Sequence, residues 1–165
     1  MTLYNQDQIQ AIASRIKHIP FGMFTTIDDA SIMSSRPLTT QELDKEGNLW
    51  FFSQDDAQFV HDMERHPIVN VSYSDTSHHV YLSITGEAHL LKDRDRARVL
   101  WKPAVRAWFP RGVDDPHLAL IRLRIHTAEY WDANTRGMKQ LLTMARTALT
   151  GRRPGGMGEH TTICL

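Results

Sequence analysis

The segment at residues 117–133, HLALIRLRIHTAEYWDA, alternates regularly along its length. Leu118, Leu120, Arg122 and Arg124 fall on one face, and the residues between them, all apolar, fall on the other. A period of two residues is typical of a β-strand that buries one side. The segment predicts a long strand, and a long strand must pair within a sheet. The fold is therefore expected to be organised around that sheet.

Five further segments have the composition of strands: FGMFTTID, SIMSSRPL, LWFFS, PIVNVSYSD and HHVYLSITGEAHLL. Asp28 and Asp29 mark a tight turn between the first two, and Gly86 marks a bulge or bend in the last. About six strands, joined mostly by turns with few helices between them, favour an antiparallel barrel or sandwich over a parallel α/β sheet. The predicted class is mainly β with flanking helices.

Three segments have the periodicity or composition of helices. Residues 5–19 carry isoleucines at helical spacing and predict an amphipathic helix. Residues 53–67 predict a second helix, capped by Ser53 or Asp55 and ended by a proline. Residues 93–109 form a charged helical segment that Pro103 interrupts.

The C-terminal segment, residues 136–165, differs from the rest. It combines an apolar stripe with several basic residues, and no acidic residue occurs before Glu159. We predict a basic helix followed by a flexible tail around GRRPGG, separate from a barrel domain at residues 1–135. The helix packs its leucine face on the barrel or, alternatively, contacts acidic lipid or nucleic acid.

Composition narrows the class of protein. The 165 residues carry 19 basic and 19 acidic side chains, so the formal net charge is zero, which argues against a general nucleic-acid-binding protein. The single cysteine, Cys164, excludes an intrachain disulfide. No signal peptide and no apolar run of membrane-spanning length is visible. We therefore expect a soluble, cytoplasmic protein that binds neither nucleic acid nor membrane.

Three short motifs carry candidate chemistry. SSRPL places two hydroxyls beside Arg36, which suits an anion, and Pro37 favours an edge or bulge for that strand. LWFFSQDDA joins an aromatic strand to a helix start, where Ser53 and backbone N–H groups can hold an anion. AEYWDA places two aromatic rings, Tyr130 and Trp131, at the end of the last strand. Together they suit a phosphorylated aromatic ligand.

Each motif also has a purely structural interpretation. Arg36 could pair with an acid on a neighbouring strand, LWFF could lie in the core, and the two rings of AEYWDA could close the barrel end. Metal and nucleophilic chemistry have little support, because His61 and His66 lack a third ligand nearby and no HExxH, paired-cysteine or GxSxG motif occurs. We predict no metal site.

The order and spacing of these motifs resemble the FMN-binding split-barrel family of pyridoxamine 5'-phosphate oxidase-like proteins, and most closely its general stress protein branch. The resemblance covers roughly residues 5–133 and rests on FGMFTT, MSSRPL, GNLWFFSQDDA, ERHPIVNVSYSD, YLSITGEAHLL, LWKPAVRAWFPRGVDDPHLALIRLRI and AEYWDA. It implies a six-stranded antiparallel split β-barrel. It also implies a homodimer that holds FMN at the subunit interface.

The resemblance assigns roles to one strand. It implies that Arg36 contacts the FMN phosphate, with Ser34 or Ser35 beside it. It also implies that the main chain around Pro37 and Leu38 runs along the isoalloxazine ring.

Other roles fall on more distant segments. Phe52 and Ser53 match the aromatic and hydroxyl pair that approaches the ribityl and phosphate end. Tyr81 matches a polar side chain that reaches the ring from the partner subunit, and Trp131 or Trp108 could approach from there as well.

Two departures from the family pattern leave the function open. Phe59 stands where many relatives carry a phosphate-binding lysine, and the C-terminus lacks the arginine-bearing strand that holds the substrate in the true oxidase. Vitamin B6 oxidation is therefore not expected. The alternatives are a flavin-dependent oxidoreductase, a non-catalytic flavin carrier or sensor, and a barrel that binds FAD, a deazaflavin or haem instead of FMN.

Overall fold

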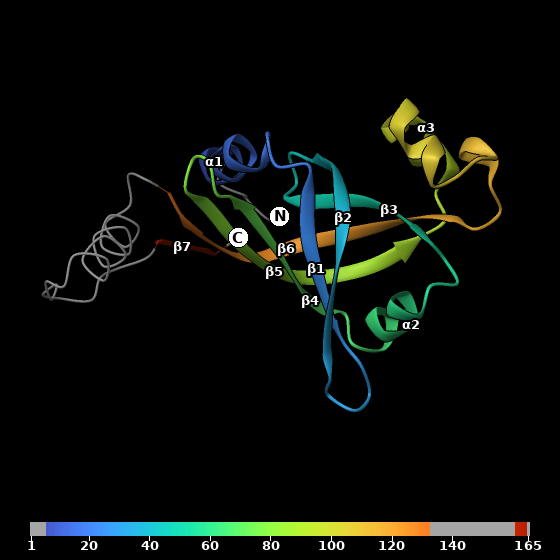
Figure 1. The fold of residues 1–165 in the computed structure, drawn as a ribbon, viewed down its shortest axis with the longest axis horizontal. Coiled ribbons are helices and arrows are strands. Elements are labelled where there is room, and N and C mark those ends of the chain that lie inside the picture. Colours follow the sequence, from blue (N-terminus) through green and yellow to red (C-terminus); the bar gives the residue numbers. More distant parts are fainter. Residues whose placement is uncertain (1–5, 133–160, 165) are drawn as a thin grey trace, which may run out of the picture.

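The structure, a computed structural model, describes residues 6–132 and 161–164. The described helices and strands are α1 (Gln6–Ile16), β1 (Phe21–Ile27), β2 (Met33–Leu43), β3 (Asn48–Gln54), α2 (Gln58–Arg65), β4 (Ile68–Asp75), β5 (Val80–Leu91), α3 (Arg94–Leu100), the short 3-10 helices η1 (Pro103–Ala107) and η2 (Gly112–Asp114), β6 (Leu118–Trp131) and β7 (Thr161–Cys164) (Figure 1). The predicted basic helix and the GRRPGG segment lie outside the described residues.

Six antiparallel strands close into a barrel. The sheet has the order β3-β2-β1-β4-β5-β6, and β3 also pairs with β6, which joins the two edges. The long strand predicted from its alternation, β6, pairs with β5 along one side and with β3 along the first half of the other. The predicted fold class, mainly β with a six-stranded antiparallel barrel, is confirmed.

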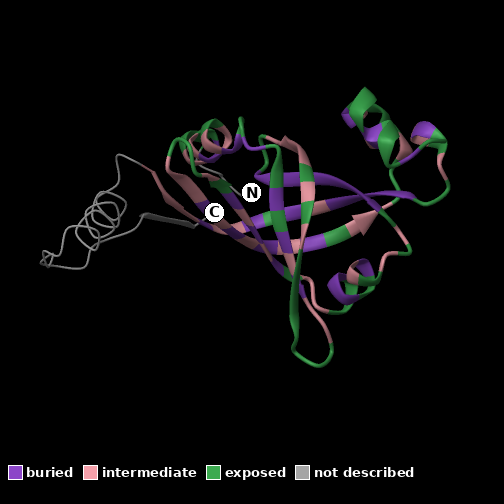
Figure 2. Ribbon diagram, in the orientation of Figure 1, coloured by how far each residue is buried: buried purple, intermediate pink, exposed green. Residues whose placement is uncertain are grey.

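The barrel interior is the main hydrophobic core. The strands alternate as their sequences predict, so that Val69, Val71 and Tyr73 of β4 point inward and are almost fully buried. Burial raises the pKa of Tyr73, and its hydroxyl lies 2.6 Å from Oγ1 of Thr40. In Figure 2 β3 and the first half of β6 are largely buried, whereas β2 contains no buried residue, and the loop between β1 and β2 and much of α3 are exposed.

A second cluster lies outside the barrel, where α3, η1 and η2 cover the outer face of β3 and β6. Alternation along β3 therefore serves both cores. Leu49 and Phe51 face the barrel interior, and Trp50 and Phe52 face the α3 cluster. This is why LWFF is an unbroken apolar run rather than an alternating one.

Helix α1 packs its isoleucines on the main core and is tied to the end of β6. Arg15 forms an ion pair of 2.7 Å with Asp132, and its guanidinium carbon lies 3.7 Å from the ring centroid of Tyr130. None of the described helices is long and apolar enough to cross a membrane.

Two expectations were wrong in detail. Neither Ser53 nor Asp55 caps α2: the N-cap is Ala57, with no side-chain hydrogen bond, because Ser53 lies in β3 and the Asp55 carboxylate contacts Lys92 and His117. The end of the chain, expected to be loose, includes the strand β7, which pairs with residues 127–130 of β6. β7 occupies the part of the β6 edge that lies beyond β3.

The bulge predicted at Gly86 is confirmed. The β5–β6 register shifts between Thr85 and Gly86. A Cβ atom at Gly86 would lie 2.1 Å from the carbonyl oxygen of Arg124, so only glycine allows the two strands to come this close.

Candidate functional site

Strand β2 separates the predicted site residues onto two faces. Arg36 pairs in register with Phe24 of β1, and Ser34 pairs with Thr26, so these four residues share one face. Ser35 lies on the opposite face, where its hydroxyl is 2.7 Å from that of Thr25. The structure therefore brings Ser34, but not Ser35, to Arg36.

Pro37 occupies a part of β2 with one neighbouring strand. It pairs with Met23 of β1, whereas β3 pairs with β2 only from Thr40 onward. A residue without an N–H is tolerated there, as predicted for an edge. Pro37 is exposed on the outer face, and the side chain of Leu38 packs against the main core. The side chain of Leu38 is only partly buried there.

The guanidinium of Arg36 is held by three hydrogen bonds. Its Nη1 donates to Oγ1 of Thr26 at 2.8 Å and to the carbonyl oxygen of Phe24 at 3.3 Å, and its Nη2 donates to Oγ of Ser34 at 2.5 Å. A guanidinium has five N–H donors, so two remain for a ligand. A positively charged group fixed by neutral oxygens, with donors left over, suits binding of an anion.

No carboxylate pairs with Arg36 among the described residues, so the alternative of a simple ion pair on a neighbouring strand is not found. Instead the ring of Phe59, from α2, lies 4.6 Å from its guanidinium carbon. Phe59 also packs against Phe24 with 6.2 Å between ring centroids. Burial lowers the pKa of Arg36, and the negative charge of Asp62 acts in the opposite direction.

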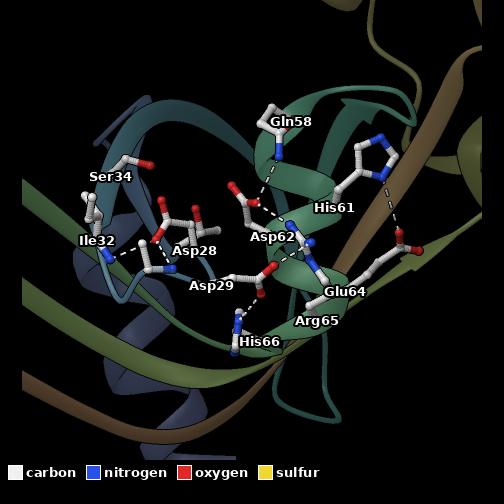
Figure 3. A network of polar contacts seen from close by, with 12 residues as sticks. Asp28, Asp29, Ile32, Ser34, Gln58, His61, Asp62, Glu64, Arg65 and His66 are labelled. Atoms are coloured by element: carbon white, nitrogen blue, oxygen red, sulfur yellow. Dashed lines mark hydrogen bonds and ion pairs between the residues drawn. The ribbon is translucent and has the colours of Figure 1, made fainter.

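A polar network on α2 surrounds Asp62 (Figure 3). Gln58 Nε2 and Arg65 Nη2 donate to Oδ1 of Asp62 at 3.0 and 3.1 Å. Arg65 also forms an ion pair of 2.6 Å with Asp29 in the β1–β2 turn, and Nε2 of His66 lies 2.8 Å from the same carboxylate. The charge of Arg65 is thus matched by two carboxylates, which leaves Arg36 as the cation available at this site among the described residues.

Phe52 and Ser53 are adjacent in the sequence, but their side chains lie in two different environments. The ring of Phe52 packs edge-on against Trp101 in the α3 cluster and is only 9% exposed, so its side chain is enclosed. Ser53 is buried at the end of β3, and its hydroxyl donates to the Gln54 carbonyl at 3.2 Å. The side chains of LWFF therefore belong to the hydrophobic cores, which agrees with the structural interpretation of this motif. Its main chain and Ser53 are the parts of the segment that could contact a ligand.

The remaining aromatic candidates lie at two separate places in the fold. Tyr81 of β5 and Trp131 of β6 are register partners at the end of the sheet near β7. Trp108 follows η1 at the other end of β6 and is 74% exposed. A strand of 14 residues separates Trp108 from Trp131, roughly 40 Å of extended chain. One chain does not bring both tryptophans to one site.

A second cluster of polar side chains joins the end of β3 to the start of β6. Nδ1 of His117 lies 3.0 Å from Asp55 and 3.8 Å from Asp56, and these three residues are arranged so that they could hold a metal ion. Lys92 already forms an ion pair with Asp55. Its ammonium group supplies the positive charge that a metal would bring.

Sequence reasoning missed Thr26, the carbonyl oxygen of Phe24 and Asp62. Thr26 is the residue that an antiparallel hairpin with its turn at Asp28 and Asp29 places opposite Ser34. The sequence therefore contained enough information to predict this strand register. The position of Asp62 depends on how α2 packs against the barrel, and no local pattern predicts it.

The comparisons with known proteins agree with this architecture. The family model described as pyridoxamine 5'-phosphate oxidase like matches residues 7–155. The protein bli-3 from Neurospora crassa is 24% identical over 155 residues, which cover 88% of this chain and 74% of that protein.

Solved structures show the same fold. A putative general stress family protein from Xanthomonas campestris is 30% identical with a TM-score of 0.62, over 79% of this chain and 89% of that one. The general stress FMN/FAD binding protein from Xanthomonas citri is 26% identical with a TM-score of 0.68, over 79% of this chain and 92% of that one. The general stress protein 26 relative from Clostridium acetobutylicum, 14% identical with a TM-score of 0.68 over 80% and 93%, supports the fold alone.

The closed six-stranded barrel, with α2 beside Arg36 and with α3 outside, defines a split-barrel protein. The family match spans most of the chain. The chain therefore belongs to the pyridoxamine 5'-phosphate oxidase-like family, as its motifs predicted.

Proposed function

We propose that this protein binds a flavin whose phosphate is held by Arg36. The observation that carries the proposal is the geometry of that guanidinium, which three neutral oxygens fix in place while two donors remain. The Xanthomonas citri relative described as FMN/FAD binding supports the same ligand class. FMN is the expected cofactor, with FAD as the alternative.

The flavin ring is proposed to lie between two copies of the chain. Tyr81 and Trp131 pair with each other on β5 and β6, whereas Arg36 lies on β2, and we propose that these two rings cover the flavin from a second subunit. An exposed apolar patch on the outer face of β1 and β2 supports association. Its members are Phe21, Met23 and Pro37, and Phe21 and Met23 are 55% and 43% exposed.

Sedimentation of the purified protein tests the dimer. We expect a dimer whose dissociation is promoted by Met23→Glu, because a charge would be buried in the apolar patch. The matched control is Val99→Glu, a similar change at an exposed position of α3. A monomeric wild-type protein would contradict the proposal.

The absorption spectrum and a flavin titration test the ligand. We expect the purified protein to carry flavin bands or to take up FMN, and to bind riboflavin much more weakly because riboflavin has no phosphate. A protein with a haem band, or one that binds no flavin, would contradict the proposal.

Redox activity is a separate question. When bound, the flavin would supply the redox chemistry, and the chain would bind and orient it. We propose an oxidoreductase, with a non-catalytic flavin carrier or sensor as the alternative. Oxidation of NAD(P)H by the flavin-loaded protein distinguishes the two, because a carrier shows no turnover. A cytoplasmic location stays a prediction.

A further inference from the structure

We propose that Phe59 is a positioning residue for the flavin phosphate, because its aromatic ring fixes the guanidinium of Arg36 that binds this phosphate. The inference rests on the proposed flavin function and adds a second residue to the same site. The side chain of Phe59 has no charge and no hydrogen-bonding group. It therefore contributes to phosphate binding only through Arg36.

The first observation is the contact between the ring and the cation. The guanidinium carbon of Arg36 lies over the ring of Phe59, 4.6 Å from its centroid. An aromatic ring attracts a cation through its negative face and adds no opposite charge. A carboxylate in the same place would also hold the guanidinium, but it would cancel the charge that attracts an anion. The contact therefore orders Arg36 and leaves it able to bind a phosphate.

The second observation is that the ring and the hydrogen bonds hold Arg36 together. Nη1 donates to Thr26 and to the carbonyl oxygen of Phe24, and Nη2 donates to Ser34. None of the hydrogen bonds that Arg36 makes to the described residues uses Nε. The N–H of Nε and one N–H of Nη2 thus remain for a ligand. They belong to a guanidinium that three oxygens and one ring hold in place.

The third observation is that the ring of Phe59 is itself held by the barrel. It packs against the main core and edge-on against Phe24, with 6.2 Å between ring centroids. Phe24 is fully buried, and its ring lies 5.6 Å from that of Phe51. Phe24 also supplies one of the oxygens that bind Arg36. A continuous set of contacts therefore joins the core to the guanidinium through Phe59.

This ordering should increase the affinity for a phosphate. An arginine side chain has many rotamers, and binding of a ligand restricts them. Because the ring already restricts Arg36, less entropy is lost when the phosphate binds. The structural alternative is that Phe59 only closes the barrel beside α2. Its loss would then lower the free energy of unfolding without a specific effect on phosphate binding.

Equilibrium titration of the purified protein with FMN and riboflavin tests the inference. Phe59→Leu keeps an apolar side chain but removes the ring, so we expect FMN to bind roughly three- to tenfold more weakly, the range of a partly exposed cation–π contact. Riboflavin, which has no phosphate, should bind both proteins equally. Phe59→Tyr keeps the ring and should bind FMN as wild type does. The matched control is Phe109→Leu, which removes a ring from the α3 cluster and should leave the FMN affinity unchanged.

A double-mutant cycle shows whether Phe59 acts through Arg36. In the Arg36→Gln background no guanidinium remains for the ring to hold. Phe59→Leu should therefore cause no further loss of FMN affinity in that background. A ring that contacts the ligand directly, or that only supports the fold, predicts the same loss in both backgrounds.

The outcomes separate this inference from the proposed function. Wild-type binding of FMN with an unchanged affinity in Phe59→Leu would overturn the positioning role and leave the flavin function standing. Equal losses for FMN and riboflavin, equal losses in Phe59→Leu and Phe109→Leu, or an undiminished loss in the Arg36→Gln background would overturn the role as well. If the wild-type protein binds no FMN, the proposed function and this inference both fail.

Discussion

Nη1 of Arg36 lies 2.8 Å from Oγ1 of Thr26, and Thr26 is only 2% exposed. The contact ties a partly exposed cation to a buried point of the barrel wall. Because Phe24 and Ser34 supply the other two contacts, the guanidinium is oriented before any ligand arrives. Such preorganisation reduces the entropy lost on binding.

Thr26→Val tests this orientation. Valine has nearly the same shape but no acceptor, so we expect phosphorylated flavins to bind roughly three- to tenfold more weakly, the size of one hydrogen bond. Calorimetric titration measures the change. Thr25→Val, on the opposite face beside Ser35, is the matched control and should leave the affinity unchanged. Equal losses in the two variants would count against the oriented guanidinium.

Asp29→Asn should loosen the β1–β2 turn. The Asp29 carboxylate holds this turn to α2 through Arg65 and His66. These side chains are about half exposed, so we expect a loss below about 1 kcal/mol in the free energy of unfolding. Hydrogen exchange should rise in residues 27–33. Unchanged protection against hydrogen exchange in this turn would contradict the proposed role of Asp29 in holding the turn to α2.

Gly86→Ala should destabilise the barrel by about 3 kcal/mol, because its Cβ would meet the Arg124 carbonyl oxygen at 2.1 Å. The matched control is Gly112→Ala. Gly112 has a φ of 76° and no atom near a built Cβ, so only backbone strain of about 1 kcal/mol is expected. Chemical denaturation measures both variants. Similar losses at the two positions would contradict the steric explanation.

The interactions of Asp55 should make the free energy of unfolding depend on pH. Hydrogen bonds from Lys92 and His117 lower the pKa of Asp55. A carboxylate with a lowered folded-state pKa stabilises the fold above its unfolded pKa, and this contribution is lost as the pH falls through the folded value. Asp55→Asn should therefore be less stable than wild type near about pH 7, with the difference shrinking below about pH 4. Thermal unfolding across this range measures it, and a difference independent of pH would contradict the assignment.

Much of the fold could be predicted from periodicity. The alternation in β4 and β6 identified the faces that are buried, and Gly86 identified the bulge. The strand β7 could not be predicted, because four residues that pair with an existing edge leave no periodic pattern. The caps of α2 were missed because Ser53 and Asp55 have the chemistry of caps but are engaged elsewhere.

The candidate site was predictable in part. SSRPL identified Arg36 and Ser34 correctly as neighbours, since residues two apart share a strand face. It could not show whether Arg36 met an acid or a neutral partner, because that depends on how α2 packs. The sequence also could not show that the side chain of Phe52 lies in the α3 cluster, because that depends on how α3 packs on β3. The subunit roles of Tyr81, Trp108 and Trp131 stay predictions.

One titration tests the central claim most directly. Arg36→Gln keeps polarity and approximate length but removes the charge and the donor fork. We predict that FMN binds the variant roughly ten- to hundredfold more weakly than wild type, while the weak binding of riboflavin is the same in both. An equal FMN affinity in variant and wild type, or an equal loss for riboflavin, would contradict the role of Arg36 in holding a flavin phosphate.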